Sequence, residues 1–366
     1  MQIHIFIAHM GIGGAERVCV NLSNELARRG HEVHIIVLNL KDDINTGYLD
    51  KSVQVHELGV SRLRYSAIPM LRYIKKIKPR FIFCFGNEMA VILNKLRKLS
   101  LIDVRIMVRV LNNINISLEK EDNVSPVVEQ YLKNAQHQLA DMDYVIAQCN
   151  AMGKQLTDKK VVEEARMSVI YNPVSDILIE DTEKARTEKK RGNKEIVFVG
   201  RLDPQKNPED LIEIFDSLRA KRYDVTLRIV GGGYLEEKTK ELVESKGLGE
   251  RVIFDGIRKD MPQVYAGADA VVLTSNYEGM PNCLIEAIGC GIPVISYDCP
   301  IGPAEIIEND VNGYLIPMGN KDEFVDKLDM TLDRDWNRDS IKKTCDKFRV
   351  SNIADTYLTI FGRLNS

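Results

Sequence analysis

The sequence predicts an α/β fold of two units, each a mostly parallel sheet with helices on its faces. Short apolar runs alternate with segments in which apolar residues recur at helical spacing, which is typical of a doubly wound sheet. The alternation stops at the charged stretch 180–195 and then starts again, and the length of 366 residues suits two domains. Two Rossmann-like units facing across a cleft are therefore expected, with ligands beyond the carboxyl ends of the strands.

Apolar runs and turn residues define the elements of the first unit. A helix is expected over 15–29, where Val18, Leu22 and Leu26 recur at helical spacing and Gly30 ends the segment. The run 33–38 is nearly continuous in apolar residues, as in a parallel strand buried on both faces. The expected strands of this unit are 3–8, 33–38, 81–85, 104–108 and 144–147.

The second unit repeats this pattern. Residues 180–195 are mostly charged and are interpreted as a surface connection near the domain boundary. The expected strands after them are 196–199, 226–230, 252–254, 270–274 and 294–296, and the expected helices are 208–220 and 235–246.

Charge and composition exclude some functions. With 50 Lys and Arg against 53 Asp and Glu, the net charge of −3 argues against a nucleic-acid binder. Residues 61–110 nevertheless contain twelve basic residues and only two acidic ones, a net charge of about +10. Within them, 62–80 predicts an amphipathic helix that begins near Pro69. Such a helix either rests on anionic lipid or simply has a solvated outer face, and both interpretations stay open.

The cysteines and the N-terminus favour a cytoplasmic protein. Seven scattered cysteines form neither a disulfide framework nor a CxxC pair, so reduced thiols are expected. The first residues run directly into a strand pattern and do not resemble a signal peptide. No stretch approaches ~18 uninterrupted apolar residues, so any membrane contact is expected to be peripheral, on the inner face.

A glycine-rich turn, Gly11-Ile12-Gly13-Gly14-Ala15-Glu16, lies between the first strand and the first helix. Glycines there let a phosphate approach the backbone and the helix N-terminus. A tight turn without a ligand explains the same residues equally well. A nicotinamide site would need a third glycine, where Glu16 stands, and an acid after the second strand, where Asn39 stands. Dinucleotide binding is therefore disfavoured.

Two later segments place charged groups at the carboxyl ends of strands. The stretch from Gly200 to Asn207 contains Arg201 and Lys206, and two cations in one loop can balance the charge of a departing diphosphate. The stretch EGMPNCLIE contains Glu278 in a loop and Glu286 about one turn inside a helix. Loop amides and the helix N-terminus can face a phosphate, while Glu286, in an apolar setting, can accept hydrogen bonds from a ribose. Solvated charges are the alternative for both segments.

In combination, these residues resemble the retaining glycosyltransferases of family 4, which have the GT-B fold. The resemblance rests on Gly200-Arg201 with Lys206, on the Glu278 and Glu286 pair, on Gly13-Gly14-Ala15-Glu16 and on Asn312-Gly313-Tyr314-Leu315. It implies an acceptor-binding domain of residues 1–175 with a returning helix at about 350–366, and a nucleotide-sugar-binding domain of residues 176–349. It also implies transfer with retention, no cofactor and no divalent metal.

The resemblance assigns expected roles to individual residues. Arg201 and Lys206 would hold the donor diphosphate, Glu278 would lie near the sugar, and Glu286 would bind the ribose. The Gly13-Gly14 turn would close against the phosphates or the acceptor. The loop expected to bind the donor consists of Gly279, Met280, Pro281, Asn282, Cys283 and Leu284. The expected partners are a nucleotide-sugar, with a UDP-sugar foremost, and a glycan or lipid-linked acceptor in polysaccharide synthesis, with no nucleic acid.

Some features depart from the family or leave alternatives. Many relatives have a histidine where Leu111 stands here, and Asn112 or Asn113 is a substitute candidate. Asp141-Met142-Asp143 resembles a metal-binding Asp-x-Asp but is interpreted as a surface pair. A sugar-nucleotide epimerase of the same fold and a catalytically silent partner subunit remain alternatives, and an NAD-dependent oxidoreductase is the least favoured.

Overall fold

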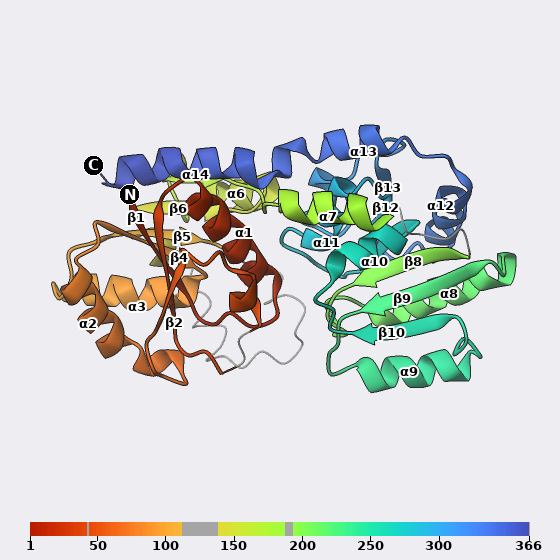
Figure 1. Ribbon diagram of the computed structural model, residues 1–366, viewed down its shortest axis with the longest axis horizontal. Coiled ribbons are helices and arrows are strands. Elements are labelled where there is room, and N and C mark those ends of the chain that lie inside the picture. The colour runs from red at the N-terminus through yellow and green to blue at the C-terminus, as the bar shows by residue number, and fades with distance from the viewer. Residues whose placement is uncertain (42–43, 112–137, 187–192, 366) are drawn as a thin grey trace. The chain divides into compact units, whose positions relative to one another are not determined.

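The computed structural model describes residues 1–41, 44–111, 138–186 and 193–365. It divides into two compact units, Met1–Pro173 with Val350–Ser366, and Val174–Arg349. We call them unit 1 and unit 2. Each contains one parallel sheet with helices on its faces (Figure 1), so the predicted two-domain α/β fold is confirmed.

Unit 1 has a seven-stranded sheet in the order β3-β2-β1-β4-β5-β6-β7. Its strands are β1 (Gln2–Ile7), β2 (Glu32–Val37), β3 (Gln54–Glu57), β4 (Phe81–Phe85), β5 (Arg105–Arg109), β6 (Tyr144–Ala147) and β7 (Met167–Val169). Its α-helices in the described ranges are α1 (Gly14–Arg28), α2 (Ala67–Ile77), α3 (Asn87–Lys98), α6 (Asn150–Asp158) and α14 (Val350–Asn365). The sheet edges β3 and β7 escaped prediction because they are short and only partly buried.

The last helix, α14, completes the core of unit 1. It packs beside α1, and Tyr357 and Phe361 place their ring centroids 5.3 and 5.7 Å from that of Phe83 in β4. Arg109, at the end of β5, is fully buried and donates hydrogen bonds to the Tyr357 hydroxyl and to the Asn172 side chain, the latter at 2.5 Å. The helix is therefore an integral part of unit 1 despite its distance in sequence.

Three histidines from neighbouring strands stack beneath α2. The His34 ring stacks on His4 of β1 and on His56 of β3, with centroid distances of 4.8 and 5.2 Å. Tyr73 of α2 bonds to His4 at 2.9 Å. Burial, together with the neighbouring His34 and His56, lowers the pKa of His4 to about 4, so this ring is neutral near pH 7. An aromatic stack thus supports α2, which begins at Ala67, near the expected Pro69.

Unit 2 has a six-stranded sheet in the order β10-β9-β8-β11-β12-β13. Its strands are β8 (Lys194–Val199), β9 (Val225–Val230), β10 (Val252–Gly256), β11 (Ala270–Leu273), β12 (Val294–Tyr297) and β13 (Gly313–Ile316). Its described α-helices are α7 (Asp176–Arg186), α8 (Pro208–Lys221), α9 (Glu236–Ser245), α10 (Met261–Gly267), α11 (Asn282–Gly289), α12 (Lys321–Asp333) and α13 (Arg338–Thr344). The chain leaves β8 toward β9 on one side and reaches β11 on the other, so the topological switch point lies between β8 and β11.

The interpretation of 180–195 as a surface connection is wrong for its first part. Helix α7 extends to Arg186, with Leu178, Ile179 and Thr182 buried. Arg186 donates a hydrogen bond to the carbonyl of Cys290 at 3.1 Å. The two apolar residues precede the charged stretch, so the charge density concealed a helix with one buried face. Residues 187–192 lie outside the described ranges.

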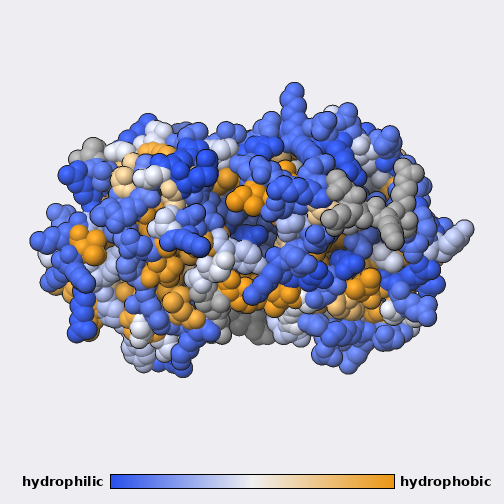
Figure 2. Space-filling view, in the orientation of Figure 1, coloured by the Kyte–Doolittle hydropathy of each residue, from blue (hydrophilic) through white to orange (hydrophobic). Residues whose placement is uncertain are grey.

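The surface and the cysteines agree with an ordinary globular protein. Figure 2 shows a mainly hydrophilic face on which hydrophobic residues form separate small patches. All seven cysteines are buried, and none is joined in a disulfide. Within the described residues, no helix has both the length and the apolar character needed to cross a membrane.

Candidate active site

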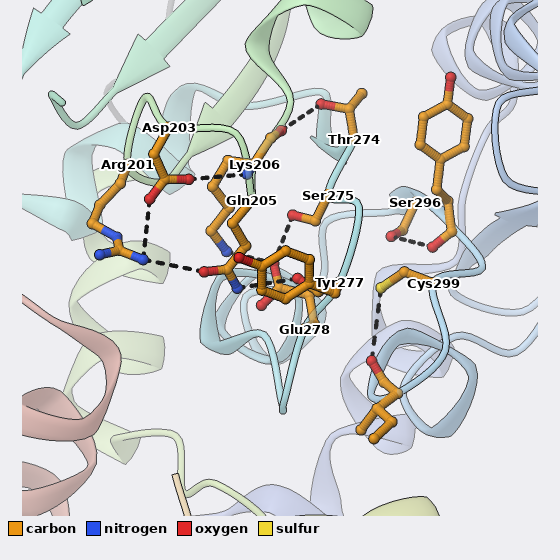
Figure 3. A network of polar contacts seen from close by, with 12 residues as sticks. Arg201, Asp203, Gln205, Lys206, Thr274, Ser275, Tyr277, Glu278, Ser296 and Cys299 are labelled. Atoms are coloured by element: carbon orange, nitrogen blue, oxygen red, sulfur yellow. Dashed lines mark hydrogen bonds and ion pairs between the residues drawn. The ribbon is translucent and has the colours of Figure 1, made fainter. Parts of the chain in front are cut away.

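The candidate site lies at the switch point of unit 2, where the loops after β8 and β11 meet. Parallel strands end at one edge of the sheet, so residues far apart in sequence come together there. The loop after β8 contributes Arg201 and Lys206, and the loop after β11 contributes Ser275 and Glu278. Figure 3 shows these side chains joined in one polar network. Sequence reasoning identified three of these four residues, Arg201, Lys206 and Glu278.

Backbone packing holds the loop after β8 in place. The Gly200 amide donates to the carbonyl of Val230 at 3.0 Å, and the Leu202 amide donates to that of Gly232 at 3.1 Å. Gly231 has a φ of +128°, and a Cβ there would overlap the carbonyl oxygen of Gly200. The close approach of the loops after β8 and β9 therefore requires glycine at position 231.

Lys206 and Glu278 form a buried ion pair at the centre of the site. The Lys206 ammonium lies 2.5 Å from Oε1 of Glu278, and the two side chains are 14% and 6% exposed. Burial alone would lower the pKa of Lys206, but the Glu278 carboxylate raises it above its usual value, so Lys206 is positively charged at neutral pH. The site thus contains a fixed cation in a low-dielectric setting.

Ser275 binds the same Glu278 oxygen that Lys206 contacts. Its hydroxyl, almost fully buried, donates to Oε1 at 2.6 Å. Among the described residues, no hydrogen bond or ion pair involves Oε2 of Glu278. The carboxylate therefore has one oxygen engaged by the protein and one available for a ligand hydroxyl.

Arg201 is more exposed than Lys206, and its guanidinium is contacted by Asp203 and Gln205. Its guanidinium lies 3.1 Å from Asp203 and donates to the Gln205 side-chain oxygen, also at 3.1 Å, while its side chain is 64% exposed. Gln205 in turn donates to the carbonyl of Tyr277 at 3.0 Å. The loop after β8 therefore presents one buried and one accessible cation.

Gly279, Met280 and Pro281 lie in the loop that leads into α11, whereas Asn282, Cys283 and Leu284, which were expected in the same loop, form the first turn of that helix. Gly302 has a φ of +100°, and a Cβ there would lie 2.7 Å from the Gly279 carbonyl, so this glycine permits close packing behind the loop. Met280, Cys283 and Leu284 are buried. Burial raises the pKa of Cys283 to about 12, so its thiol stays protonated at neutral pH.

Glu286 lies one turn into α11, as expected, and is half-buried. The hydroxyl of Tyr265, a fully buried residue of α10, donates to Oε2 of Glu286 at 2.7 Å. Burial, followed by the charge of Glu286, raises the pKa of Tyr265 well above its usual value and keeps it a donor. This hydrogen bond offsets part of the cost of placing a carboxylate in apolar surroundings.

Gly13 and Gly14 belong to unit 1, whereas the other predicted site residues belong to unit 2. Gly13 caps α1, and the Glu16 carboxylate folds back over Gly13. His9 lies 3.1 Å from the same carboxylate. The protein's own acid therefore occupies the N-terminus of α1, the position expected for a phosphate.

The remaining sequence candidates have simpler surroundings. Leu111 is half-buried, and its carbonyl accepts a hydrogen bond from Gln148 at 2.5 Å, whereas Asn112 and Asn113 lie outside the described residues. Asp141 pairs with Lys98 at 2.6 Å, and Asp143 pairs with Arg97. These aspartates therefore attach α3 next to β6. No group of three or more His, Cys, Asp or Glu side chains within the described ranges is arranged to hold a metal ion.

Three contributing residues were missed by sequence reasoning. Gln205, Tyr265 and Ser275 contact the predicted residues Arg201, Glu286 and Glu278 in turn. Ser275 follows β11 directly, so its place at a carboxyl strand end was a usable signal. Tyr265 carries no such signal, because α10 meets α11 only in the folded unit.

Comparison with known proteins identifies the family. Two family models match, Glycosyltransferase Family 4 over residues 12–176 and Glycosyl transferases group 1 over residues 179–348. The chain belongs to the GT-B glycosyltransferases of the family 4 type. The lipopolysaccharide 1,6-galactosyltransferase of Escherichia coli is 26% identical over 335 residues, which is 87% of this chain and 85% of that protein.

Other relatives of this glycosyltransferase match over nearly the whole chain. An N-acetylgalactosaminyltransferase of Campylobacter jejuni, acting on N-acetylgalactosamine-N,N'-diacetylbacillosaminyl-diphospho-undecaprenol, is 26% identical over 98% of this chain and 99% of its own. HepE of Anabaena in complex with UDP-glucose matches with a TM-score of 0.79 at 20% identity, over 99% of this chain and 100% of HepE. The latter likeness shows the shared fold.

Proposed function

We propose that this glycosyltransferase moves a hexosyl group, with retention, from a UDP-sugar to a glycan or lipid-linked acceptor in polysaccharide synthesis. The observation that carries the proposal is the buried Lys206–Glu278 pair at the switch point, with Arg201 in the same loop. The polysaccharide context is supported by the relatives, which include a lipopolysaccharide galactosyltransferase and an amylovoran biosynthesis glycosyltransferase of Erwinia amylovora. The UDP-sugar is supported by HepE, whose structure contains UDP-glucose.

Arg201 and Lys206 supply the positive charge that a departing diphosphate needs. As the bond from the sugar to the diphosphate breaks, negative charge accumulates on the diphosphate oxygens, and fixed cations stabilise it without reorganisation. Lys206 already carries its charge in a buried position, and Arg201 is accessible to a ligand. Amides at the start of α11 add the partial positive charge of a helix N-terminus.

The two glutamates orient the donor. Glu278 has Oε1 held by Lys206 and Ser275, so Oε2 is the oxygen that accepts a hydrogen bond from a sugar hydroxyl. Glu286 is anchored through Tyr265 and accepts from the ribose hydroxyls. A catalytically silent homologue is expected to have lost the cations or Glu286, and this chain has all three residues.

A donor panel tests the proposal directly. We expect UDP-sugars to raise the Tm more than GDP- or ADP-sugars, because a ligand that binds only the folded state stabilises it. Arg201→Ala should abolish most of this rise, whereas Lys238→Ala, which changes an exposed lysine of α9, should retain it. The proposal fails if no nucleotide-sugar shifts the Tm, or if Arg201→Ala responds like the wild type. The anomeric configuration of the product, measured by NMR, tests retention separately.

We further propose that α2 brings this enzyme to an anionic membrane surface, where a lipid-linked acceptor would lie. One face of α2 is buried through Met70 and Ile74. The other face exposes the cations Arg72, Lys75 and Lys76 beside Ile68, which is 62% exposed. Cations next to an exposed apolar side chain are typical of helices that rest on anionic lipid.

Liposome co-sedimentation tests the membrane proposal. The triple variant Arg72→Gln/Lys75→Gln/Lys76→Gln should bind anionic vesicles about 100-fold more weakly, since each cation contributes about 1 kcal/mol near such a surface. A matched control changes three exposed lysines of unit 2, namely Lys238, Lys259 and Lys343, to glutamine and should bind like the wild type. Equal binding of the wild type to neutral and anionic vesicles would contradict the proposal.

A further inference from the structure

We propose that Gln205 is a positioning residue of the donor site, which aims the Arg201 guanidinium and fixes its distance from Glu278. This inference rests on the proposed function, because it assigns the diphosphate to Arg201. Gln205 does not itself contact the donor in this scheme. Its effect passes through Arg201.

Arg201 needs such support because its side chain is 64% exposed. An exposed arginine samples many rotamers, and only those pointing at the ligand stabilise developing charge. Two groups restrict it here, Asp203 and Gln205, each at 3.1 Å. Asp203 neutralises part of the cationic charge, whereas Gln205 holds the guanidinium without adding a negative charge.

Gln205 is itself fixed to the loop that carries Glu278. Its amide nitrogen donates to the Tyr277 carbonyl at 3.0 Å, and its own backbone carbonyl accepts from the Asn276 amide at 2.8 Å. The Asn276 side chain donates to the carbonyl of the preceding residue, Pro204, at 2.8 Å. Figure 3 shows the resulting path from Arg201 through Gln205 to Tyr277, the neighbour of Glu278 in sequence. The two loops of the switch point are thereby joined.

The amide side chain of Gln205 makes both contacts. The Arg201 guanidinium requires an acceptor, and the Tyr277 carbonyl requires a donor, and glutamine supplies both from one group. Glutamate would keep the acceptor but set a carboxylate oxygen against the Tyr277 carbonyl, and methionine would lose both contacts at similar length. In the reverse orientation, the amide nitrogen would face the guanidinium, which is also a donor, and the amide oxygen would face the Tyr277 carbonyl, which is also an acceptor. Only one orientation of the amide therefore fits the network.

A double-mutant cycle tests the inference, with UDP as the probe in calorimetry. Gln205→Ala should weaken UDP binding about tenfold, the change in Kd for one lost hydrogen bond to a charged group. Arg201→Ala should weaken it at least as much. The double variant should bind within about twofold of Arg201→Ala, because Gln205 has no target once the guanidinium is gone. Gln205→Met, which preserves side-chain length, should repeat this pattern, and Gln263→Ala on α10 should bind UDP like the wild type.

Each outcome decides the question. Multiplicative effects of Gln205→Ala and Arg201→Ala would show that Gln205 acts independently of the arginine and would overturn the inference alone. Unchanged UDP binding by both Gln205 variants would also overturn it while leaving the proposed function standing. Failure of the wild type to bind UDP would overturn the UDP-sugar proposal and this inference with it.

Discussion

Removing Lys206 is expected to abolish sugar transfer, with kcat/KM falling by at least about 10²–10³-fold, the effect of losing one group that stabilises transition-state charge. The buried ion pair complicates the simplest variant. Lys206→Ala would leave the Glu278 carboxylate buried without a counter-ion, at a cost of about 3–5 kcal/mol in the free energy of unfolding. Loss of activity in that variant alone would not separate a catalytic role from a damaged fold.

The double variant Lys206→Met/Glu278→Gln separates the two effects. It removes both charges of the buried pair, so its free energy of unfolding should stay close to that of the wild type. Glu278→Gln alone should also lower the free energy of unfolding, because it leaves the Lys206 charge without its partner, but it should retain UDP binding while losing transfer, whereas the double variant should lose both. Lys221→Met, which breaks an exposed ion pair with Asp326, is the control and should change neither stability nor transfer. Normal UDP binding by the double variant would contradict the diphosphate role of Lys206.

Gly231→Ala is expected to be the most disruptive single change among the glycines near the site. Its φ of +128° is strained for any residue with a side chain, and the added Cβ would overlap the Gly200 carbonyl. Neither backbone can yield without moving the loop that carries Arg201. We expect a loss of about 3–5 kcal/mol in the free energy of unfolding, measured in urea, together with loss of transfer.

Gly247→Ala provides the matched control for this prediction. Its φ of +64° is also in the left-handed region, but nothing lies within 4 Å of the added Cβ. The backbone strain alone should cost about 1–2 kcal/mol and leave transfer unchanged. If Gly231→Ala proves as stable and active as Gly247→Ala, the close approach of the loops after β8 and β9 does not hold the site in place.

Local patterns were enough to predict the central strands and most of the side chains that meet at the switch point. Core strands such as β4 are apolar throughout, and Arg201, Lys206 and Glu278 follow strands whose ends are recognisable in sequence. The edge strand β3 was missed because it is short and only partly buried, and the helix α7 was missed because charged residues mask its one buried face. Long-range partners could not be predicted, since Lys206 and Glu278 meet only because β8 and β11 are neighbours in the sheet.

The place of α14 in the core of unit 1 has a consequence for the order of folding during synthesis. Unit 2 is one continuous segment, Val174–Arg349, and can close while the ribosome is still translating. Unit 1 is synthesised first, but its core cannot be completed until residues 350–366 are made, because Phe83 packs against Tyr357 and Phe361. At roughly 5–20 residues per second, residues 174–366 take about 10–40 s to make. The half of the protein that is made first is therefore the last to be completed, and its uncovered aromatic surface is a natural substrate for chaperones in that interval.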